Sequence, residues 1–393
     1  MLLRIIFFLL FLLVAPHLFL LWRFRTSLTR GQRLLLSLPN ALLIAGSLLL
    51  SFFQTYSPAN AQLTGLFLVL FIGWTGAELF LSLFCLLSLA FKKIPIIEKM
   101  ILRLGFAVFV AVILIATYGH FRGMSRLQVV HEDLYFQDLP AGFDGYRMAV
   151  FSDFHLGTYG TSNAMPRKVV ETILAQKPQV ILFLGDLVNY RTQETEPAFA
   201  ELQRLKAPDG VFSVMGNHDY QMHVRWDSPR RQYASIEQLK ETERRAGWTL
   251  LCNENRIITH GGDSMAILGV ENDGKPPFPE LGDLSAAQSG LSDTLANGQP
   301  LFKVLLSHDP SHWRRKVLPQ TDIQLTLSGH THATQFQIGR FSPARWVYPE
   351  WGGLYREGSR QLYVSKGIGG ALLPFRFGAW PEINILTLHK TQE

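Results

Sequence analysis

The sequence predicts an α/β domain that follows a group of four membrane-spanning helices. All long apolar stretches lie before residue 120, whereas the rest of the chain holds short apolar runs that alternate with helical patterns. Such alternation of strands and helices is typical of α/β domains. Several of the short runs are followed at once by Asp, Asn or His. We therefore expect three parts: a transmembrane region at 1–121, a linker at 122–145 and a catalytic domain at 146–393.

The first part of the chain contains four apolar stretches, each close to the ~20 residues that a membrane-spanning helix needs. A cleaved signal peptide is the alternative interpretation of the first stretch. It fits poorly, because a single charge, Arg4, precedes the stretch and no pair of small residues suited to cleavage follows it. The predicted spans are approximately 5–22, 34–53, 63–91 and 100–119.

Charge is distributed unevenly along the chain, and this distribution predicts the membrane topology. Residues 1–126 carry a formal charge of +9, and the remainder carries −3. The 23–33 loop holds four Arg and the 92–99 loop three Lys, while the 54–62 loop has no charge. Positively charged loops tend to stay in the cytoplasm. We therefore expect a multi-pass protein of the inner (cell) membrane with its catalytic domain on the extracytoplasmic side, although Arg122 and Arg126 oppose this orientation.

A basic membrane region and a mildly acidic remainder argue against a nucleic-acid partner. Glu78, in the third predicted span, is a candidate functional residue because intramembrane acids are costly. The alternative, which we favour, is that Glu78 caps a contact between helices, since the sequence shows no evident partner for it. The oligomeric state is not indicated by the sequence.

Eight short apolar runs after residue 145 are rich in Val, Ile, Leu and Phe, which is typical of buried strands. They are 146–152, 179–184, 210–215, 265–270, 301–307, 322–328, 361–365 and 382–389. One further strand is possible at 126–131, within the linker. Helical patterns occupy 163–176, 197–206 and 235–246.

Polar residues at the ends of five of these strands predict a metal site. Ligands of α/β sheets gather outside the carboxyl ends of strands. Carboxylate and amide oxygens with imidazole nitrogens suit Mn, Fe, Zn or Ni. A serine hydrolase is not supported, because Ser152 lacks the G-x-S-x-G turn. The predicted ligands are Asp153, His155, Asp186, Asn217, His308, His330 and His332.

Seven ligands exceed the needs of one tetrahedral ion and divide naturally between two ions that share a carboxylate. Two such ions, ~3.5–4 Å apart, can polarise a phosphoryl group and hold a nucleophilic hydroxide between them. We therefore expect two divalent ions, with Mn²⁺ as the first candidate and Fe, Zn or Ni as alternatives.

Five sequence blocks carry a resemblance to a known family. SDFHLG (152–157), GDLV (185–188), GNHD (216–219), SHDP (307–310) and GHTH (329–332) resemble, in this order, the motifs of the calcineurin-like metallophosphoesterases. The segment 365–383 is similar to the membrane-linked bacterial branch of that family. The resemblance implies two packed mixed β-sheets flanked by helices, a four-layer αββα sandwich.

The resemblance also implies roles for individual residues. The first metal ion would be held by Asp153, His155, Asp186 and His332, and the second by Asp186, Asn217, His308 and His330. Asp186 would bridge the two ions. His218 would act on the leaving-group oxygen and be oriented by Asp219. Arg376 is a candidate for substrate binding, because a guanidinium pairs well with phosphate; a structural salt bridge to Glu382 is the alternative.

The expected activity is hydrolysis of a phosphodiester, a pyrophosphate or a phosphomonoester by a metal-bridging hydroxide. A membrane anchor makes a phospholipid or a lipid-linked pyrophosphate a plausible substrate. The alternatives are a nuclease or nucleotide phosphodiesterase of the same fold, and a catalytically inactive membrane sensor. A transporter is not favoured, because the membrane region shows no repeat.

Overall fold

The computed structural model describes residues 2–50, 58–292, 294–295, 298, 300–371 and 373–391, without the side chains of residues 2–10 and 58–59. Contacts between residues divide the chain into two compact units. The membrane unit comprises Met1–Arg122 and Leu373–Phe375, and the catalytic unit comprises Gly123–Leu372 and Arg376–Glu393.

Four helices form the membrane unit, and they coincide with the four predicted spans. They are α1 (Leu2–Arg23), α2 (Arg30–Leu50), α3 (Pro58–Ala90) and α4 (Pro95–Phe121). The end of the second predicted span, 51–53, lies outside the described residues. Helices α2, α3 and α4 are long and apolar enough to cross a membrane, and the described side chains of α1 form a shorter apolar helix, Phe11–Arg23.

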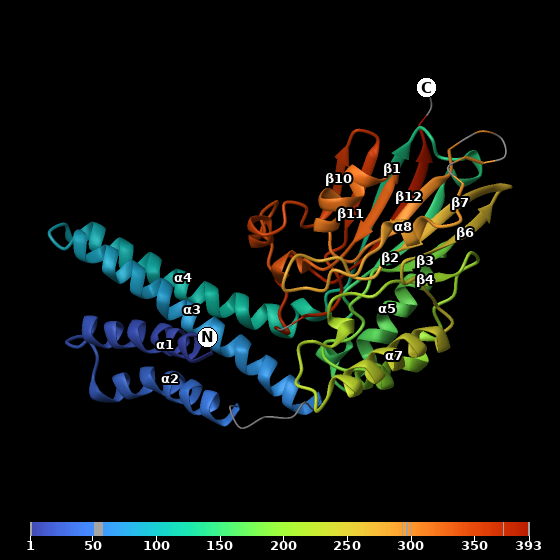
Figure 1. Ribbon diagram of the computed structural model, residues 1–393. Coiled ribbons are helices and arrows are strands. Elements are labelled where there is room, and N and C mark those ends of the chain that lie inside the picture. The colour runs from blue at the N-terminus through green and yellow to red at the C-terminus, as the bar shows by residue number, and fades with distance from the viewer. Residues whose placement is uncertain are drawn as a thin grey trace. The chain divides into compact units, whose positions relative to one another are not determined.

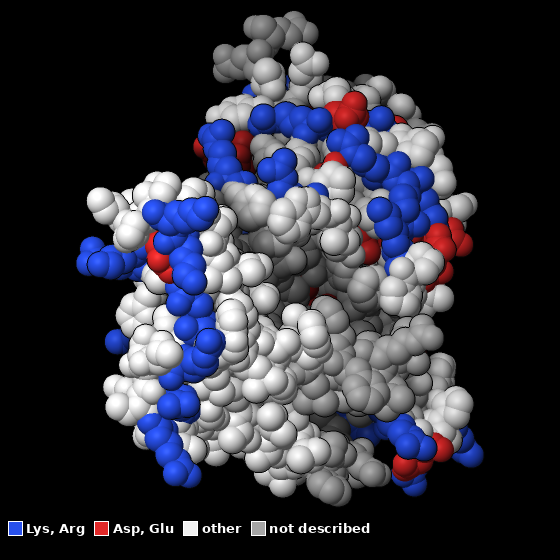
Figure 2. Space-filling view, turned by 90° about the vertical axis from the view of Figure 1, so that its left-hand side faces the viewer, with Lys and Arg blue, Asp and Glu red and all other residues white. Residues whose placement is uncertain are grey.

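The outward side chains of this unit are apolar rather than polar. Leu35, Ile96 and Phe121 are 70%, 82% and 69% exposed. Figure 2 shows a broad area that carries no charged side chains, between bands of Lys and Arg. Burial in a bilayer removes the free-energy cost that such an apolar surface has in water, so the helices have the surface expected of membrane spans.

The catalytic unit contains two six-stranded mixed sheets. The first sheet has the order β1-β12-β2-β3-β4-β5, and the second has the order β10-β11-β9-β8-β7-β6. The strands of the first sheet are β1 (Gln128–Phe136), β12 (Glu382–Lys390), β2 (Tyr146–Phe151), β3 (Val180–Phe183), β4 (Val211–Ser213) and β5 (Thr249–Leu250). Those of the second are β10 (Gly353–Glu357), β11 (Arg360–Val364), β9 (Leu325–Ser328), β8 (Phe302–Leu306), β7 (Asp263–Gly269) and β6 (Glu254–His260).

The side chains of each strand alternate between the two faces of its sheet, and this alternation produces the layers of the predicted αββα sandwich. Successive side chains of a strand point to opposite faces, so Met148 and Val150 of β2 pack between the two sheets. Ala149 and Phe151 of the same strand instead face α5 (Ala164–Ala175) and α7 (Pro229–Arg245), which cover the outer face of the first sheet (Figure 1). A third cluster packs α8 (Leu284–Gln288) and Trp313 on the second sheet.

All eight predicted strands are present, but the structure differs from the prediction in three places. The predicted linker contains β1, which pairs in parallel with β12 along its whole length, so the catalytic unit includes most of that segment. Strands β5, β6 and β10 were not predicted; β6 reads ENRIITH, with too few apolar residues to mark it. The helical pattern at 197–206 forms only α6 (Phe199–Leu202), because Pro197 lies in a preceding 3-10 turn.

A buried acid on α7 yields a stability prediction. Glu243 is 1% exposed and accepts a hydrogen bond from Ser213 Oγ at 2.5 Å. Burial, and then the charge of Asp219, raise the pKa of Glu243 to about 8. Between its ordinary value of 4.5 and this raised pKa, the folded protein keeps a proton that the unfolded chain has released. The contribution of Glu243 to stability is therefore lost as the pH rises through that window.

Glu243→Gln, which is neutral at every pH, should raise the free energy of unfolding by about 1–3 kcal/mol at pH 8 and change it little near pH 4.5. Thermal unfolding of the full-length protein in detergent, followed at both pH values, measures the difference. Glu241→Gln, an exposed change on the same helix, is the matched control. An equal effect of Glu243→Gln at the two pH values would contradict the argument.

Candidate metal centre

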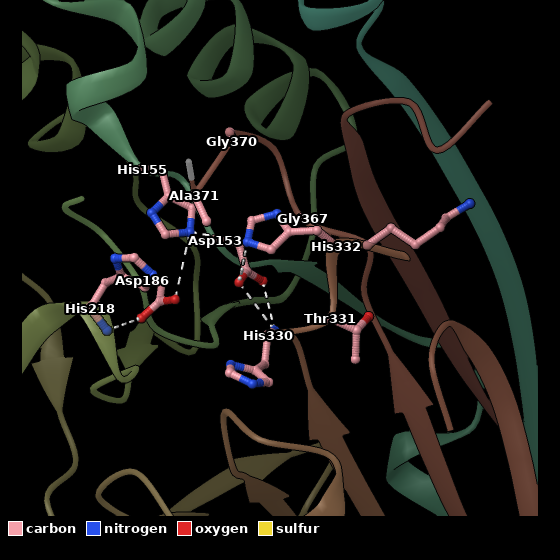
Figure 3. Close-up of polar contacts among 12 residues, drawn as sticks. Asp153, His155, Asp186, His218, His330, Thr331, His332, Gly367, Gly370 and Ala371 are labelled. Atoms are coloured by element: carbon pink, nitrogen blue, oxygen red, sulfur yellow. Dashed lines mark hydrogen bonds and ion pairs between the residues drawn. The ribbon is translucent and has the colours of Figure 1, made fainter. Parts of the chain in front are cut away.

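The structure brings all seven predicted metal ligands together. Figure 3 shows five of them: Asp153, His155, Asp186, His330 and His332. Asp153 and His155 follow β2, Asp186 follows β3, and Asn217 follows β4, all in the first sheet. The second sheet contributes three histidines that follow β8 and β9: His308, His330 and His332. The site is therefore built by strands of both sheets that deliver their carboxyl ends to one edge, as the sequence predicts.

One group of ligands comprises Asp153, His155 and His332, whose donor atoms lie within 4.8 Å of one another. The Nε2 atoms of His155 and His332 are 3.1 Å apart, and His332 Nε2 is 3.3 Å from Asp153 Oδ1. Asp186 Oδ2 lies 3.6 Å from His155 Nε2. Nitrogen and oxygen lone pairs thus converge from three turns of the chain on one small volume.

A second group comprises Asp186, His308 and His330. His308 Nε2 is 3.2 Å from Asp186 Oδ2, and His330 Nδ1 is 2.8 Å from Asn217 Oδ1. Asp186 therefore contacts histidines of both groups, which is the arrangement expected of a bridging carboxylate.

The chemistry of His308 tests whether this site fits a metal ion. Its Nδ1 donates a hydrogen bond to the carbonyl of Leu184 at 2.7 Å. Its Nε2 is buried and makes no hydrogen bond of good geometry among the described residues, although Asp186 Oδ2 lies 3.2 Å away. A metal-binding histidine usually donates a hydrogen bond from one ring nitrogen to a carbonyl, while its other ring nitrogen faces the metal site. The donor set therefore fits a divalent ion.

Electrostatics in the site favour deprotonated ligands at most positions. Burial lowers the pKa of His155 and His332 well below the ordinary histidine range, and neighbouring positive groups lower it further. Burial alone would raise the pKa of Asp186, but the adjacent His308 and His218 hold it well below its usual value. His308 differs, because the carboxylates of Asp186 and Asp153 outweigh burial and raise its pKa to about 10. A metal ion would have to displace that proton.

Backbone strain concentrates at the same residues. Asp153, His155, Asp186, His330 and His332 have φ between 48° and 71°. Non-glycine residues in this left-handed region cost about 1–3 kcal/mol each and cluster at functional sites. The strained turns are thus maintained by the surrounding structure, which supports a functional role for the residues that they carry.

Two glycines permit the close approach of the chain to Asp153. A Cβ at Gly329 would lie 2.5 Å from Asp153 Oδ2, and one at Gly367 would lie 2.6 Å from Asp153 Cβ. Neither separation is possible between non-bonded atoms, so both positions require glycine. Gly329 is the first residue of the GHTH block, and Gly367 lies in the 365–383 segment.

His218 lies beside both groups and is only partly buried. Its backbone N–H donates to Asp186 Oδ1 at 2.8 Å, and its ring is 4.7 Å from that of His155, centroid to centroid. Its Nδ1 lies 2.9 Å from the carbonyl oxygen of Asn189. One ring nitrogen is therefore held by the protein, and the histidine sits where a substrate bound at the metal ligands could reach it.

Asp219 does not supply the expected contact to the His218 ring among the described residues. It accepts hydrogen bonds from the backbone N–H groups of Asp186, Leu187 and Gly216 at 2.8, 2.9 and 2.8 Å. Burial, and then the charge of Asp186, raise the pKa of Asp219 to about 7. Asp219 thus joins the turns that carry Asp186 and Asn217, and the carbonyl of Asn189 takes the orienting position.

Arg376 is fully buried next to the first ligand group. It donates to the carbonyls of Gly369, Ala379 and Lys366 at 2.9 Å each, and its Nη2 lies 3.0 Å from His332 Nδ1. No salt bridge to Glu382 is present among the described residues; Glu382 pairs with Lys366 at 3.0 Å. These contacts suit a residue that positions His332, and substrate binding by Arg376 stays a prediction.

Sequence reasoning missed the residues that shape the site from outside. Glu194 accepts hydrogen bonds from the backbone of Asn189, Tyr190 and Arg191, which fixes the loop that contacts His218. Tyr348 Oη lies 2.7 Å from His330 Nε2. The only signal in the sequence was Asn189 itself, which follows the GDLV block; Glu194 and Tyr348 carry no motif.

Comparisons with known proteins agree with this geometry. The model of the calcineurin-like phosphoesterase family matches residues 146–334. The metallophosphoesterase YkuE of Bacillus subtilis (strain 168) is 31% identical over 263 residues, which cover 64% of this chain and 82% of YkuE.

Two further relatives are more distant. A transmembrane protein with metallophosphoesterase domain from Danio rerio is 27% identical, over 70% of this chain and 60% of that protein. The UDP-2,3-diacylglucosamine pyrophosphatase LpxG of Chlamydia trachomatis is 26% identical, over 63% of this chain and 86% of LpxG. The transmembrane relative and the apolar helices support membrane association. From its sequence blocks, its fold and the match to YkuE, the chain belongs to the calcineurin-like metallophosphoesterase family, whose members are hydrolases of phosphoester bonds.

Proposed function

We propose that the protein is a membrane-anchored phosphoesterase with a dinuclear metal site. The observation that carries this proposal is the position of Asp186 between the two groups of ligands, since one carboxylate shared by two sets of donors is suited to a pair of ions. A single structural ion would need only four ligands, and it would leave several of the buried histidines and carboxylates uncompensated.

The two groups define which residues would hold which ion. Asp153, His155, Asp186 and His332 would hold the first, and Asp186, Asn217, His308 and His330 the second. When bound, two divalent ions supply polarisation of the phosphoryl group and a hydroxide nucleophile at neutral pH. Mn²⁺ is our first candidate, and Fe, Zn and Ni suit the same donor set.

His218 would act on the leaving group. Its Nδ1 is held by the carbonyl of Asn189, so its other ring nitrogen is available to a substrate oxygen. A histidine in this position stabilises negative charge as it develops and donates a proton to the departing oxygen. Asp219 contributes by fixing the backbone of Asp186 rather than by contact with the substrate.

The substrate that we propose is a phosphodiester or pyrophosphate linked to a lipid, ahead of a simple phosphomonoester. A membrane anchor raises the local concentration of lipid substrates. The relative named as a UDP-2,3-diacylglucosamine pyrophosphatase supports a pyrophosphate in this class. The charge asymmetry of the loops supports a multi-pass arrangement with the catalytic unit outside the cytoplasm.

Asp186→Asn and His218→Ala should each abolish most activity, for different reasons. The Asp186 change removes the shared ligand, so both metal content and turnover should fall. The His218 change should keep the metal and lower kcat by about 10²–10⁴-fold, the usual contribution of a general acid. Hydrolysis of a bis-aryl phosphate by the full-length protein with added Mn²⁺, together with metal analysis, measures both effects. His389→Ala, on the last strand, is the control. The enzymatic proposal would be refuted if the wild-type protein hydrolysed the bis-aryl phosphate no faster than the two variants with any divalent ion tested.

Arg376→Lys should weaken the first metal site while the fold is retained. Lysine keeps the charge but cannot make the four contacts of the guanidinium, so the ring of His332 loses its support. Loss of such a supporting partner lowers metal affinity by about 10–100-fold. Competition with a chelator measures this affinity, and Arg360→Lys, whose guanidinium also donates to backbone carbonyls, is the matched control. Unchanged metal affinity with a raised KM would show instead that Arg376 binds the substrate.

The topology can be tested with reporters fused to the C-terminus. An outer location predicts an active periplasmic reporter, such as alkaline phosphatase, and a dark cytoplasmic fluorescent protein. The opposite pattern would place the site in the cytoplasm and would direct the search for a substrate to the inner leaflet.

A further inference from the structure

The membrane unit contains a buried polar cluster that the proposed hydrolysis does not use. His17 of α1, Asn40 of α2 and Glu78 of α3 are 6%, 4% and 0% exposed. His17 Nδ1 lies 2.9 Å from Glu78 Oε1, and Asn40 Nδ2 donates to the same oxygen at 3.0 Å. Glu78 therefore has partners 61 and 38 residues away in the chain, which no sequence pattern signals.

Hydrogen-bond accounting shows that the cluster carries no net charge. Ser37 Oγ donates to the carbonyl of Arg33 at 2.9 Å, so His17 Nε2, 3.0 Å from that hydroxyl, is the donor to it. His17 Nδ1 lies 2.9 Å from Glu78 Oε1 and 3.0 Å from Asn40 Nδ2, and that amide group already donates to Glu78 Oε1. The shorter contact, between a ring nitrogen and a carboxyl oxygen, is stable with one hydrogen between the two atoms, and whichever atom holds that hydrogen, the charges of the pair sum to zero.

Next to the cluster is an open cavity of about 500 Å³, lined by residues of all four helices. Its wall is almost entirely apolar and includes Leu20, Leu36, Leu81 and Phe106, one residue from each helix. The volume lies in the usual range of ligand sites, roughly 300–1,000 Å³. Side chains that line an apolar space of this size lack the dispersion contacts of a packed interior. In a bilayer, lipid acyl chains can fill the space and supply those contacts.

Two ionisable residues line the cavity, Glu78 and Arg103. Glu78 is neutralised by His17. Arg103 of α4 has an exposed side chain and no ion pair or hydrogen bond within the described part of the chain. The nearby Arg23 is already paired with Glu98 at 2.7 Å. The net charge at the cavity is therefore the single positive charge of Arg103.

We propose that this cavity binds one anionic phospholipid, with an acyl chain between the four helices and the headgroup phosphate against Arg103. A lipid with net negative charge complements the uncompensated guanidinium. A zwitterionic lipid offers the same acyl chain but a weaker charge interaction, because its own ammonium group competes for the phosphate. The proposal depends on the membrane-spanning arrangement of the helices and not on the activity of the metal centre.

Native mass spectrometry of the full-length protein in a neutral detergent tests the proposal. Phosphatidylglycerol and phosphatidylcholine with identical acyl chains are added separately, and the retained copies are counted. We expect one copy of phosphatidylglycerol to be retained about fivefold more tightly than phosphatidylcholine, as for one basic residue near an anionic headgroup. Arg103→Gln should abolish this preference, and Arg103→Lys should keep it. Lys99→Gln, an exposed change on the same helix, should leave it unchanged.

A second pair of variants tests the cavity itself. Leu81→Trp fills the space and should reduce retention of both lipids, whereas Leu87→Trp, an outward change on the same helix, should not. Thermal unfolding of each variant in detergent reports on the fold independently of lipid. The proposal fails if Arg103→Gln keeps the wild-type preference, if both lipids bind equally to wild type, or if Leu81→Trp retains lipid as Leu87→Trp does.

Discussion

The catalytic unit is organised around one constraint: two carboxylates and four imidazoles are buried within a few ångströms of each other. Buried charges are costly unless they are paired or coordinate a metal. His155 Nε2 and His332 Nε2 face one another at 3.1 Å, a separation at which at most one of them carries the shared hydrogen. Donor atoms crowded in this way repel one another, and a divalent ion between them would relieve that repulsion.

Because burying these charged groups costs free energy, the surrounding residues hold the site in place with hydrogen bonds. Asp219 Oδ2 accepts hydrogen bonds from the backbone N–H groups of Asp186 and Gly216, and its Oδ1 accepts one from that of Leu187. The carbonyl of Leu184 holds His308, and the guanidinium of Arg376 links His332 to the 366–379 segment. Asp186, His308 and His332 are thus each held, on the side away from the other ligands, by a group outside the ligand set. The left-handed turns persist for the same reason, since their strain is distributed over these hydrogen bonds.

The sequence was informative where chemistry depends on residue type and spacing, and uninformative where it depends on tertiary contacts. The seven candidate ligands could be named from the sequence because strand ends carry them in recognisable blocks, and the αββα layers followed from the resemblance. The partner of the His218 ring is the backbone carbonyl of Asn189. This partner could not be predicted, because every residue has a backbone carbonyl, whatever its side chain. The sequence indicates a linker with one possible strand at 126–131, and the full length of β1 could not be predicted, because burial of its residues depends on pairing with β12, 254 residues away at its first pair.

The same reasoning accounts for Glu78. From sequence, an acid in a membrane span is either a functional group or a structural cap, and the choice turns on whether it has a partner. His17 and Asn40 supply partners, so the contact between helices that we favoured is present. That contact has a further consequence, because neutralising Glu78 leaves Arg103 as the sole net charge on an apolar cavity. A polar cluster that stabilises the packing of α1, α2 and α3 thereby also determines which headgroup charge the cavity can accept.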